Sequence, residues 1–132
     1  MPIQVKWFNT SKTIILQSYH TPWTWDNYHA SAKEIDQMLD SVDYPVDLIV
    51  DFSDGAVLPA KALSHFRRAV MDIHPNRGLV VMVGMNPYLA ALQNVLEQMV
   101  PHSAARSRIA ETLDEAIAII NAEGASRYSA AG

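Results

Sequence analysis

The first residues of the chain alternate between apolar and polar side chains. Ile3, Val5 and Trp7 are separated by Gln4 and Lys6, which is the period-two pattern of a strand with one buried face. Turn-forming residues occupy positions 9–12, and the segment 13–18 contains three consecutive aliphatic residues. We therefore expect a β-hairpin at the start of the chain.

A helical period of three and four residues replaces the alternation after Pro22. The apolar members of this stripe are Trp25, Tyr28, Ala32, Ile35, Leu39 and Val42. Pro45 ends the predicted helix, because proline disfavours helical geometry in the residue before it. Residues 46–52 follow as a strand, and its uninterrupted apolar centre is typical of a parallel strand covered on both faces.

Two more helices, with a strand between them, are predicted from position 59 to position 101. Pro59 suits the first turn of a helix that runs to about residue 73, and a buried strand follows at 79–83. The turn at 84–87 leads into a third helix that ends by Pro101. The positions expected to face inward are Leu63, Phe66, Val70 and Ile73 in the earlier helix, and Leu89, Leu92, Leu96 and Met99 in the later one.

The end of the chain is predicted to form a short strand at 108–110 and a final helix. Thr112 and Glu115 have the spacing of a capping box, and Leu113, Ile117 and Ile120 are expected to bury this helix. The resulting order is β-β-α-β-α-β-α-β-α. It predicts an α/β sandwich in which a mostly parallel five-stranded sheet has an antiparallel first strand and helices packed on it. Residues 1–123 form one domain, and the small, polar segment 124–132 is expected to be a flexible tail.

Composition narrows the classes of function. The chain of 132 residues suffices for one core, and 49% hydrophobic residues with 18% charged ones argue against disorder. No apolar run approaches the ~18 residues of a membrane span, and no secretory leader is visible, so a cytoplasmic protein without an integral membrane segment is expected. The absence of cysteine excludes disulfides and thiolate sites, and a net charge of −4 argues against nucleic acid as a partner.

The element order and two segments resemble the STAS domains, and most closely their SpoIIAA-like branch. The segments are Leu48-Ile49-Val50-Asp51-Phe52 and Leu79-Val80-Val81-Met82-Val83-Gly84-Met85-Asn86-Pro87. Residues 112–117 also look like the last helix of that branch, so the resemblance covers about residues 3–122. It implies the SpoIIAA-like sandwich and, by similarity to anti-sigma-factor antagonists, a regulatory domain that binds another protein.

The regulatory serine of those antagonists has no counterpart here. Their Asp-Ser-Ser-Gly-Leu motif enters the second helix, and a partner kinase phosphorylates its first serine. The matching stretch of this chain is Pro59-Ala60-Lys61-Ala62-Leu63, in which only Leu63 agrees. Ala60 has no hydroxyl group, so the phosphate charge of the family's switch cannot be installed at this position.

Two hypotheses about what the protein binds remain open. In the first, another protein docks on the second helix and on the loops at the carboxyl ends of the strands. Its contact residues would be Ser53, Asp54, Ala60, Lys61, Ser64 and Arg68, although a basic helix face is also an ordinary solvated surface. A homodimer through exposed apolar residues is a further form of protein binding.

The second hypothesis is a carrier or sensor of a nonpolar, fatty-acid-like molecule, because the same branch is regarded as related in shape to CRAL-TRIO carriers. It predicts a cavity between the second and third helices and the sheet. The lining residues would be Trp25, Tyr28, Phe66, Met82 and Met85. The plainer interpretation of these aromatic and methionine side chains is core packing.

Catalytic and metal-binding signals are weak. Asp51 and Asp54 follow a buried strand, where open α/β sheets bind ligands, and they could serve a hydrolase or hold Mg²⁺. Asp54-Gly55 is also ordinary turn chemistry, and a strand-end Asp often caps nearby amides. The histidines at 20, 29, 65, 74 and 102 show no metal-site spacing. We therefore predict no catalytic residues, no metal and no cofactor, with Ser53 phosphorylation as a separate speculation.

Overall fold

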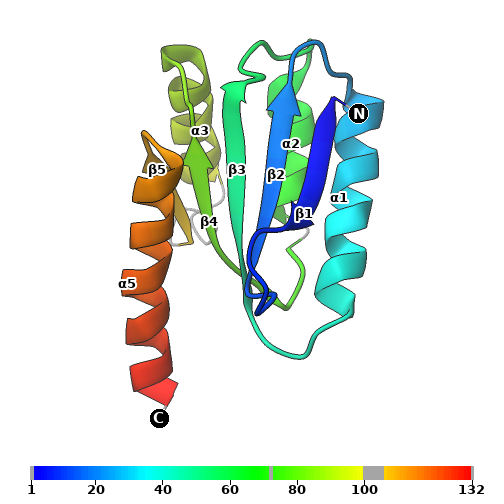
Figure 1. The fold of residues 1–132 in the computed structure, drawn as a ribbon. Coiled ribbons are helices and arrows are strands. Elements are labelled where there is room, and N and C mark those ends of the chain that lie inside the picture. The colour runs from blue at the N-terminus through cyan, green and yellow to red at the C-terminus, as the bar shows by residue number, and fades with distance from the viewer. Residues whose placement is uncertain (1, 72, 100–105, 132) are drawn as a thin grey trace.

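A computed structural model of the protein describes residues 2–71, 73–99 and 106–131. Within these ranges, nine elements follow one another (Figure 1). They are β1 (Ile3–Trp7), β2 (Ile14–His20), α1 (Trp25–Asp40), β3 (Val46–Asp54), α2 (Ala62–Met71), β4 (Arg77–Val83), α3 (Pro87–Met99), β5 (Ser107–Ala110) and α5 (Leu113–Ala131).

The sheet has five strands in the order β1-β2-β3-β4-β5. β1 pairs antiparallel with β2, as a hairpin requires, and all other neighbours are parallel. Strands that are neighbours in the sheet are also consecutive in the sequence. A helix connects the two strands of each parallel pair. The predicted α/β architecture with an antiparallel first strand is confirmed.

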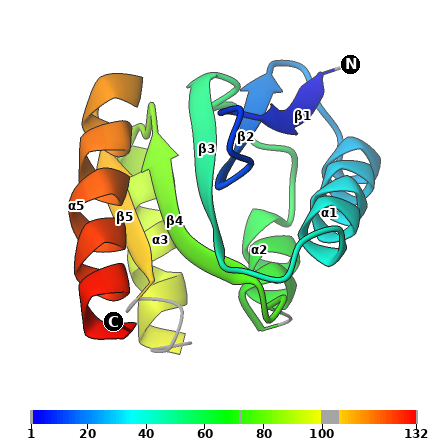
Figure 2. The same cartoon turned by 60° about the horizontal axis from the view of Figure 1, so that its bottom comes forward.

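Helices cover both faces of this sheet. Leu48, Val50 and Phe52 of β3 point into a core shared with α1, α2 and α3, whereas Ile49 points into a second core shared with α5. Figure 2 shows α5 on one side of the sheet and α1 and α2 on the other. Because successive strand residues face opposite sides, a strand between two helix layers must be apolar throughout, as the centre of β3 is.

Side-chain hydrogen bonds fix both ends of α1, from its own first residues at the start and from a distant loop at the end. The Thr24 hydroxyl accepts from the Asn27 amide, and the Asn27 side chain accepts from the Thr24 amide, which makes a complete capping box. At the other end, the Asn76 side-chain amide donates to the carbonyls of Leu39 and Val42. The loop before β4 is thereby held against the end of α1.

Helix α2 differs from the prediction in the residue at which it begins and in the side chains that it turns toward the core. It begins at Ala62 rather than near Pro59, because Lys61 has a φ of 67° and this left-handed conformation cannot belong to a right-handed helix. Ala62 is buried instead of Leu63, which is 38% exposed, while Phe66 packs against the core as expected. Ile73 lies beyond the helix, and the Val70 side chain lies outside the described residues.

The last two helices also depart from expectation. Leu89 and Leu96 are buried in α3, but Met99 is 45% exposed at its end. At the start of α5 the Thr112 hydroxyl accepts from the Glu115 amide, while the Glu115 carboxylate accepts from the Glu111 amide rather than from that of Thr112. The predicted capping box is therefore only half formed. The backbone of α5 is helical to Ala131, through most of the predicted tail, whose flexibility stays a prediction.

Gly84 should be irreplaceable in the turn between β4 and α3. Its φ is +75°, and an added Cβ would lie 2.6 Å from the Ser53 Cα. We expect Gly84→Ala to lower the free energy of unfolding by at least about 2 kcal/mol in urea titrations, because backbone strain and a backbone clash combine. The exposed Gln98→Ala variant should match the wild type. Equal stability of Gly84→Ala and the wild type would contradict the described turn.

Candidate functional site

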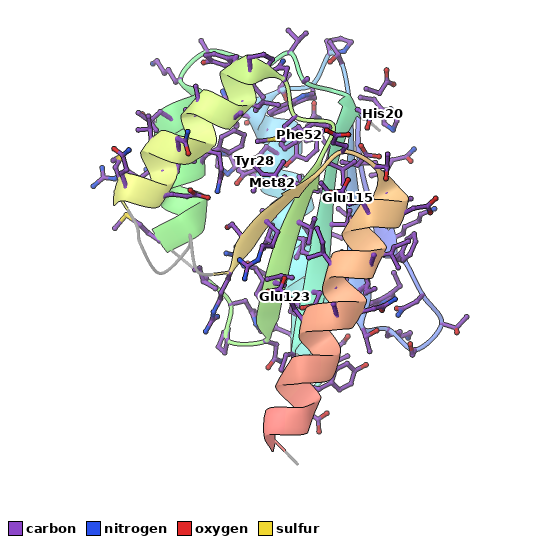
Figure 3. The ribbon with its side chains drawn as sticks, turned by 90° about the vertical axis from the view of Figure 1, so that its left-hand side faces the viewer. His20, Tyr28, Phe52, Met82, Glu115 and Glu123 are labelled. Atoms are coloured by element: carbon purple, nitrogen blue, oxygen red, sulfur yellow. The ribbon has the colours of Figure 1, made fainter. Side chains whose placement is uncertain are left out.

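A cavity of about 130 Å³ lies between the sheet and helices α1, α2 and α3. We call it the core cavity. Figure 3 shows Tyr28, Phe52 and Met82 close together on this side of the sheet. Its apolar and aromatic lining consists of Tyr19, Tyr28, Leu48, Val50, Phe52, Phe66, Val80, Met82, Met85, Leu89, Leu92 and Leu96, and its polar lining of Gln17, Arg77, Gln93 and Ser107.

The alternation of the strands places these side chains. Leu48, Val50 and Phe52 are every second residue of β3, and Val80 and Met82 have the same relation in β4. The pairing of Leu48 with Val80 and of Val50 with Met82 sets the two rows side by side. The floor of the cavity is therefore a direct consequence of strand register.

Aromatic rings run from this floor to the protein surface. Phe52 stacks on Tyr19 at 4.5 Å between ring centroids, and Tyr19 meets Trp23 edge-on at 4.9 Å. Trp23 in turn contacts Trp25 at 5.1 Å, and the Trp25 indole donates to the Ala60 carbonyl at 2.6 Å. These contacts join β2, β3 and α1 to the segment before α2 and hold one wall of the cavity in place.

The polar groups of the core cavity are anchored in different ways. Gln17 is buried in β2 and donates to the Ser31 hydroxyl at 2.9 Å, which donates to the Tyr28 carbonyl at 2.8 Å. Burial raises the pKa of Tyr28 to about 12 and the pKa of Tyr19 well above its ordinary value. Both phenols are therefore neutral at physiological pH, and the phenol walls carry no charge.

A second cavity of about 210 Å³ lies beside α1. We call it the side cavity. Gln17, Tyr28, Leu48 and Arg77 line both cavities and form the wall between them. The rim of the side cavity is more polar and includes His29, Asp36, His65, Arg68 and His74.

The predicted lining residues fall mostly at the core cavity. Tyr28, Phe66, Met82 and Met85 line it, whereas Trp25 lies outside and contacts Tyr28 and Phe66 from there. The cavity also extends to α1 in addition to the expected helices. Sequence reasoning missed Gln17 and Arg77. Gln17 had a signal, since it is a polar residue beside three aliphatic ones in a strand; Arg77 was hidden in a turn segment.

The residues predicted to bind a protein partner are all exposed, but they form two groups. Ser64 and Arg68 are spaced to lie on one face of α2, and the exposed Ala60 and Lys61 directly precede the helix. Ser53 and Asp54 lie at the end of β3. Among the described residues, no hydrogen bond or ion pair joins these two to the others.

The two candidate catalytic carboxylates have structural partners. Asp51 accepts from the Ser53 amide at 2.9 Å, and Asp54 contacts the His20 ring at 2.8 Å. The Asp51 contact fits the interpretation as a strand-end cap, whereas Asp54 pairs with an imidazole ring instead of capping an amide. No group of three or more His, Asp or Glu side chains is arranged to hold a metal ion in the described part of the chain.

Histidines 29 and 65 meet across α1 and α2, which their sequence separation of 36 residues concealed. His29 Nε2 and His65 Nδ1 are 3.0 Å apart, and the His65 ring stacks on Trp25 at 4.1 Å between centroids. His74 contacts Asp40 at 2.7 Å, and His102 lies outside the described residues. Desolvation of the half-buried His65 ring, followed by the charge of His29, lowers the pKa of His65.

Comparison with protein-family models found no matching model, and comparisons with curated proteins and with solved structures found no match either. Nothing in these comparisons identifies a STAS domain, so that resemblance stays a prediction. Among the residues that the structure describes, no helix is both long and apolar enough to span a bilayer.

The histidine pair gives a testable pH dependence. We expect His29→Asn to raise the pKa of His65, because a neighbouring group that can become positively charged is removed. An NMR titration of the His65 ring in both proteins measures this shift, and the His74→Asn variant should leave it unchanged. An identical His65 pKa with and without His29 would show that the two rings are not coupled.

Proposed function

We propose that this protein is a non-enzymatic carrier or sensor that binds a small, predominantly apolar molecule in the core cavity. The observation that carries the proposal is the cavity itself, lined by twelve apolar or aromatic side chains, several of which belong to the surrounding buried core. Protein interiors are close-packed, so side chains that border an unfilled space lack packing partners on that side. A ligand bound in this space of about 130 Å³ would supply those missing contacts.

The volume of the core cavity restricts the ligand. An engineered cavity of about 150 Å³ holds benzene, whereas pockets for drug-sized ligands start at about 300 Å³. A volume of 130 Å³ favours a body the size of one aromatic ring over a long fatty-acyl chain. The proposed ligand is accordingly smaller than the fatty-acid-like molecule suggested by the sequence.

The absence of catalysis is part of the proposal. Its support is that the Asp51 and Asp54 carboxylates already bind the Ser53 amide and the His20 ring. An acid or base would also have to face the cavity to act on a bound ligand, and neither carboxylate lines it. The side chains on the cavity floor are instead aliphatic, aromatic or methionine.

Filling the core cavity should abolish ligand binding. Toluene is a neutral probe of suitable size, and its affinity can be measured by ligand-observed NMR. We expect Leu92→Trp, whose indole would occupy the cavity, to weaken toluene binding at least tenfold. Leu63→Trp adds the same bulk on the exposed side of α2 and should bind toluene like the wild type. Failure of toluene to bind the wild type would overturn the proposal.

A second candidate function is docking of an acidic protein on α2. It is favoured by exposed cationic and apolar side chains on and just before α2. Ser64, Arg68 and Met71 recur at steps of four and three residues along the helix, and Met71 is 64% exposed. The exposed Lys61 directly precedes the helix. Positive charges around an apolar contact complement an acidic partner surface.

Charge reversal tests this docking surface. A partner captured by a photo-crosslinker at Ser64 should bind Lys61→Glu and Arg68→Glu at least tenfold more weakly in calorimetry. Lys33→Glu makes the same charge change on exposed α1 and should leave the affinity unaltered. Unchanged affinity in both α2 variants would remove this surface from consideration.

A further inference from the structure

Three hollows of the molecule meet at Arg77, the first residue of β4. Its side chain lines the core cavity, the side cavity and a third hollow beside Arg106. The backbone of Arg77 is fixed by its surroundings. Its amide donates to the His74 carbonyl at 3.0 Å, and the preceding carbonyl, that of Asn76, accepts from the Val46 amide at 2.7 Å. The guanidinium therefore extends from a strand end whose backbone is fixed by hydrogen bonds.

The Nε of Arg77 has no acceptor. It is the one buried side-chain nitrogen or oxygen among the described residues without a hydrogen-bond partner. Buried polar groups in folded proteins are almost always satisfied, because an unmade hydrogen bond to a charged donor is strongly destabilising. Arg77 also lines the core cavity, so a small rearrangement of its guanidinium on binding would offer this donor to an acceptor there.

The charge of Arg77 is also only partly compensated. Burial lowers the pKa of its guanidinium; Tyr28 and Asp36 oppose this effect, and Arg106 adds to it. An arginine in a protein nevertheless keeps its charge. The ion pairs of His20, His74 and Arg108 do not include Arg77. Arg77 is thus a partly buried cation at the edge of a cavity whose lining is mostly apolar.

We propose that Arg77 binds the carboxylate of the molecule in the core cavity, and that this ligand is a small carboxylic acid with an apolar body about the size of one aromatic ring. The inference rests on the proposed function. Nε and one terminal nitrogen of a guanidinium form a fork that matches the two oxygens of a carboxylate. The apolar side chains of Val50, Phe52 and Met82 would surround the body of the ligand.

The test compares phenylacetate with its neutral counterpart 2-phenylethanol in isothermal titration calorimetry. We expect the wild type to bind the acid at least about tenfold more tightly than the alcohol, since a charge-assisted hydrogen bond is gained. Arg77→Met should lose this preference and keep its affinity for the alcohol. Arg67→Met removes the same charge from the exposed side of α2 and should retain the preference.

The Nε–H NMR signal of Arg77 provides a second measurement, which is made on the wild-type protein. The Arg77→Met variant is needed only to assign the signal. Phenylacetate should shift this signal, whereas 2-phenylethanol should not. Equal binding of acid and alcohol by the wild type would overturn the role of Arg77 and leave the proposed function standing. Binding of neither, nor of toluene, would overturn both. Tighter binding of phenyl phosphate than of phenylacetate would overturn the carboxylate and indicate that the anionic group of the ligand is a phosphate monoester.

Discussion

Burial of β3 on both faces is the constraint on which the rest of the structure depends. Ile49 must find apolar neighbours on the α5 side while Leu48 and Val50 find theirs on the side of α1, α2 and α3. A strand buried in this way needs helices on both faces and paired strands on both edges. The order of the sheet and the placement of the helices follow from these two requirements. The core cavity then lies on the more heavily covered face, above the residues that register sets side by side.

The start of β4 connects this packing to the site. The buried Asp47 carboxylate of β3 accepts from the Leu79 amide at 2.8 Å. The Asn76 side chain donates to the carbonyl of Leu39 in the last turn of α1 and to that of Val42 just after the helix. These contacts fix the strand end that carries Arg77. The packing of β3, β4 and α1 therefore creates the core cavity and also positions the Arg77 guanidinium at one end of it. Recognition of an amphipathic acid would use both parts: the space takes the body, and the cation takes the head.

The fold could be predicted from the sequence because its signals are local. Alternation in β1, the helical stripe of α1 and the apolar centre of β3 each identify an element without reference to the others. The errors arose where a single backbone angle or a tertiary contact decided the outcome. Because Lys61 is left-handed, α2 begins later than predicted, and Leu63 is exposed. The Glu115 carboxylate binds the Glu111 amide instead of completing the capping box.

The site was less accessible to sequence reasoning. Tyr28, Phe66, Met82 and Met85 were candidates because of their chemistry, yet the same residues fit an ordinary packed core. Packing density is a property of the assembled structure, so no periodicity distinguishes a filled core from one with a cavity. Arg77 and the pair of His29 and His65 depend on contacts between segments more than 30 residues apart, which a pattern along the chain does not contain.

A crystal structure of the protein grown with phenylacetate tests the central claim most directly. We expect ring density among Phe52, Met82 and Leu89 in the core cavity, with a carboxylate oxygen about 3 Å from the Arg77 Nε. A cavity closed by its own side chains, or a ligand whose carboxylate points away from Arg77, would contradict it.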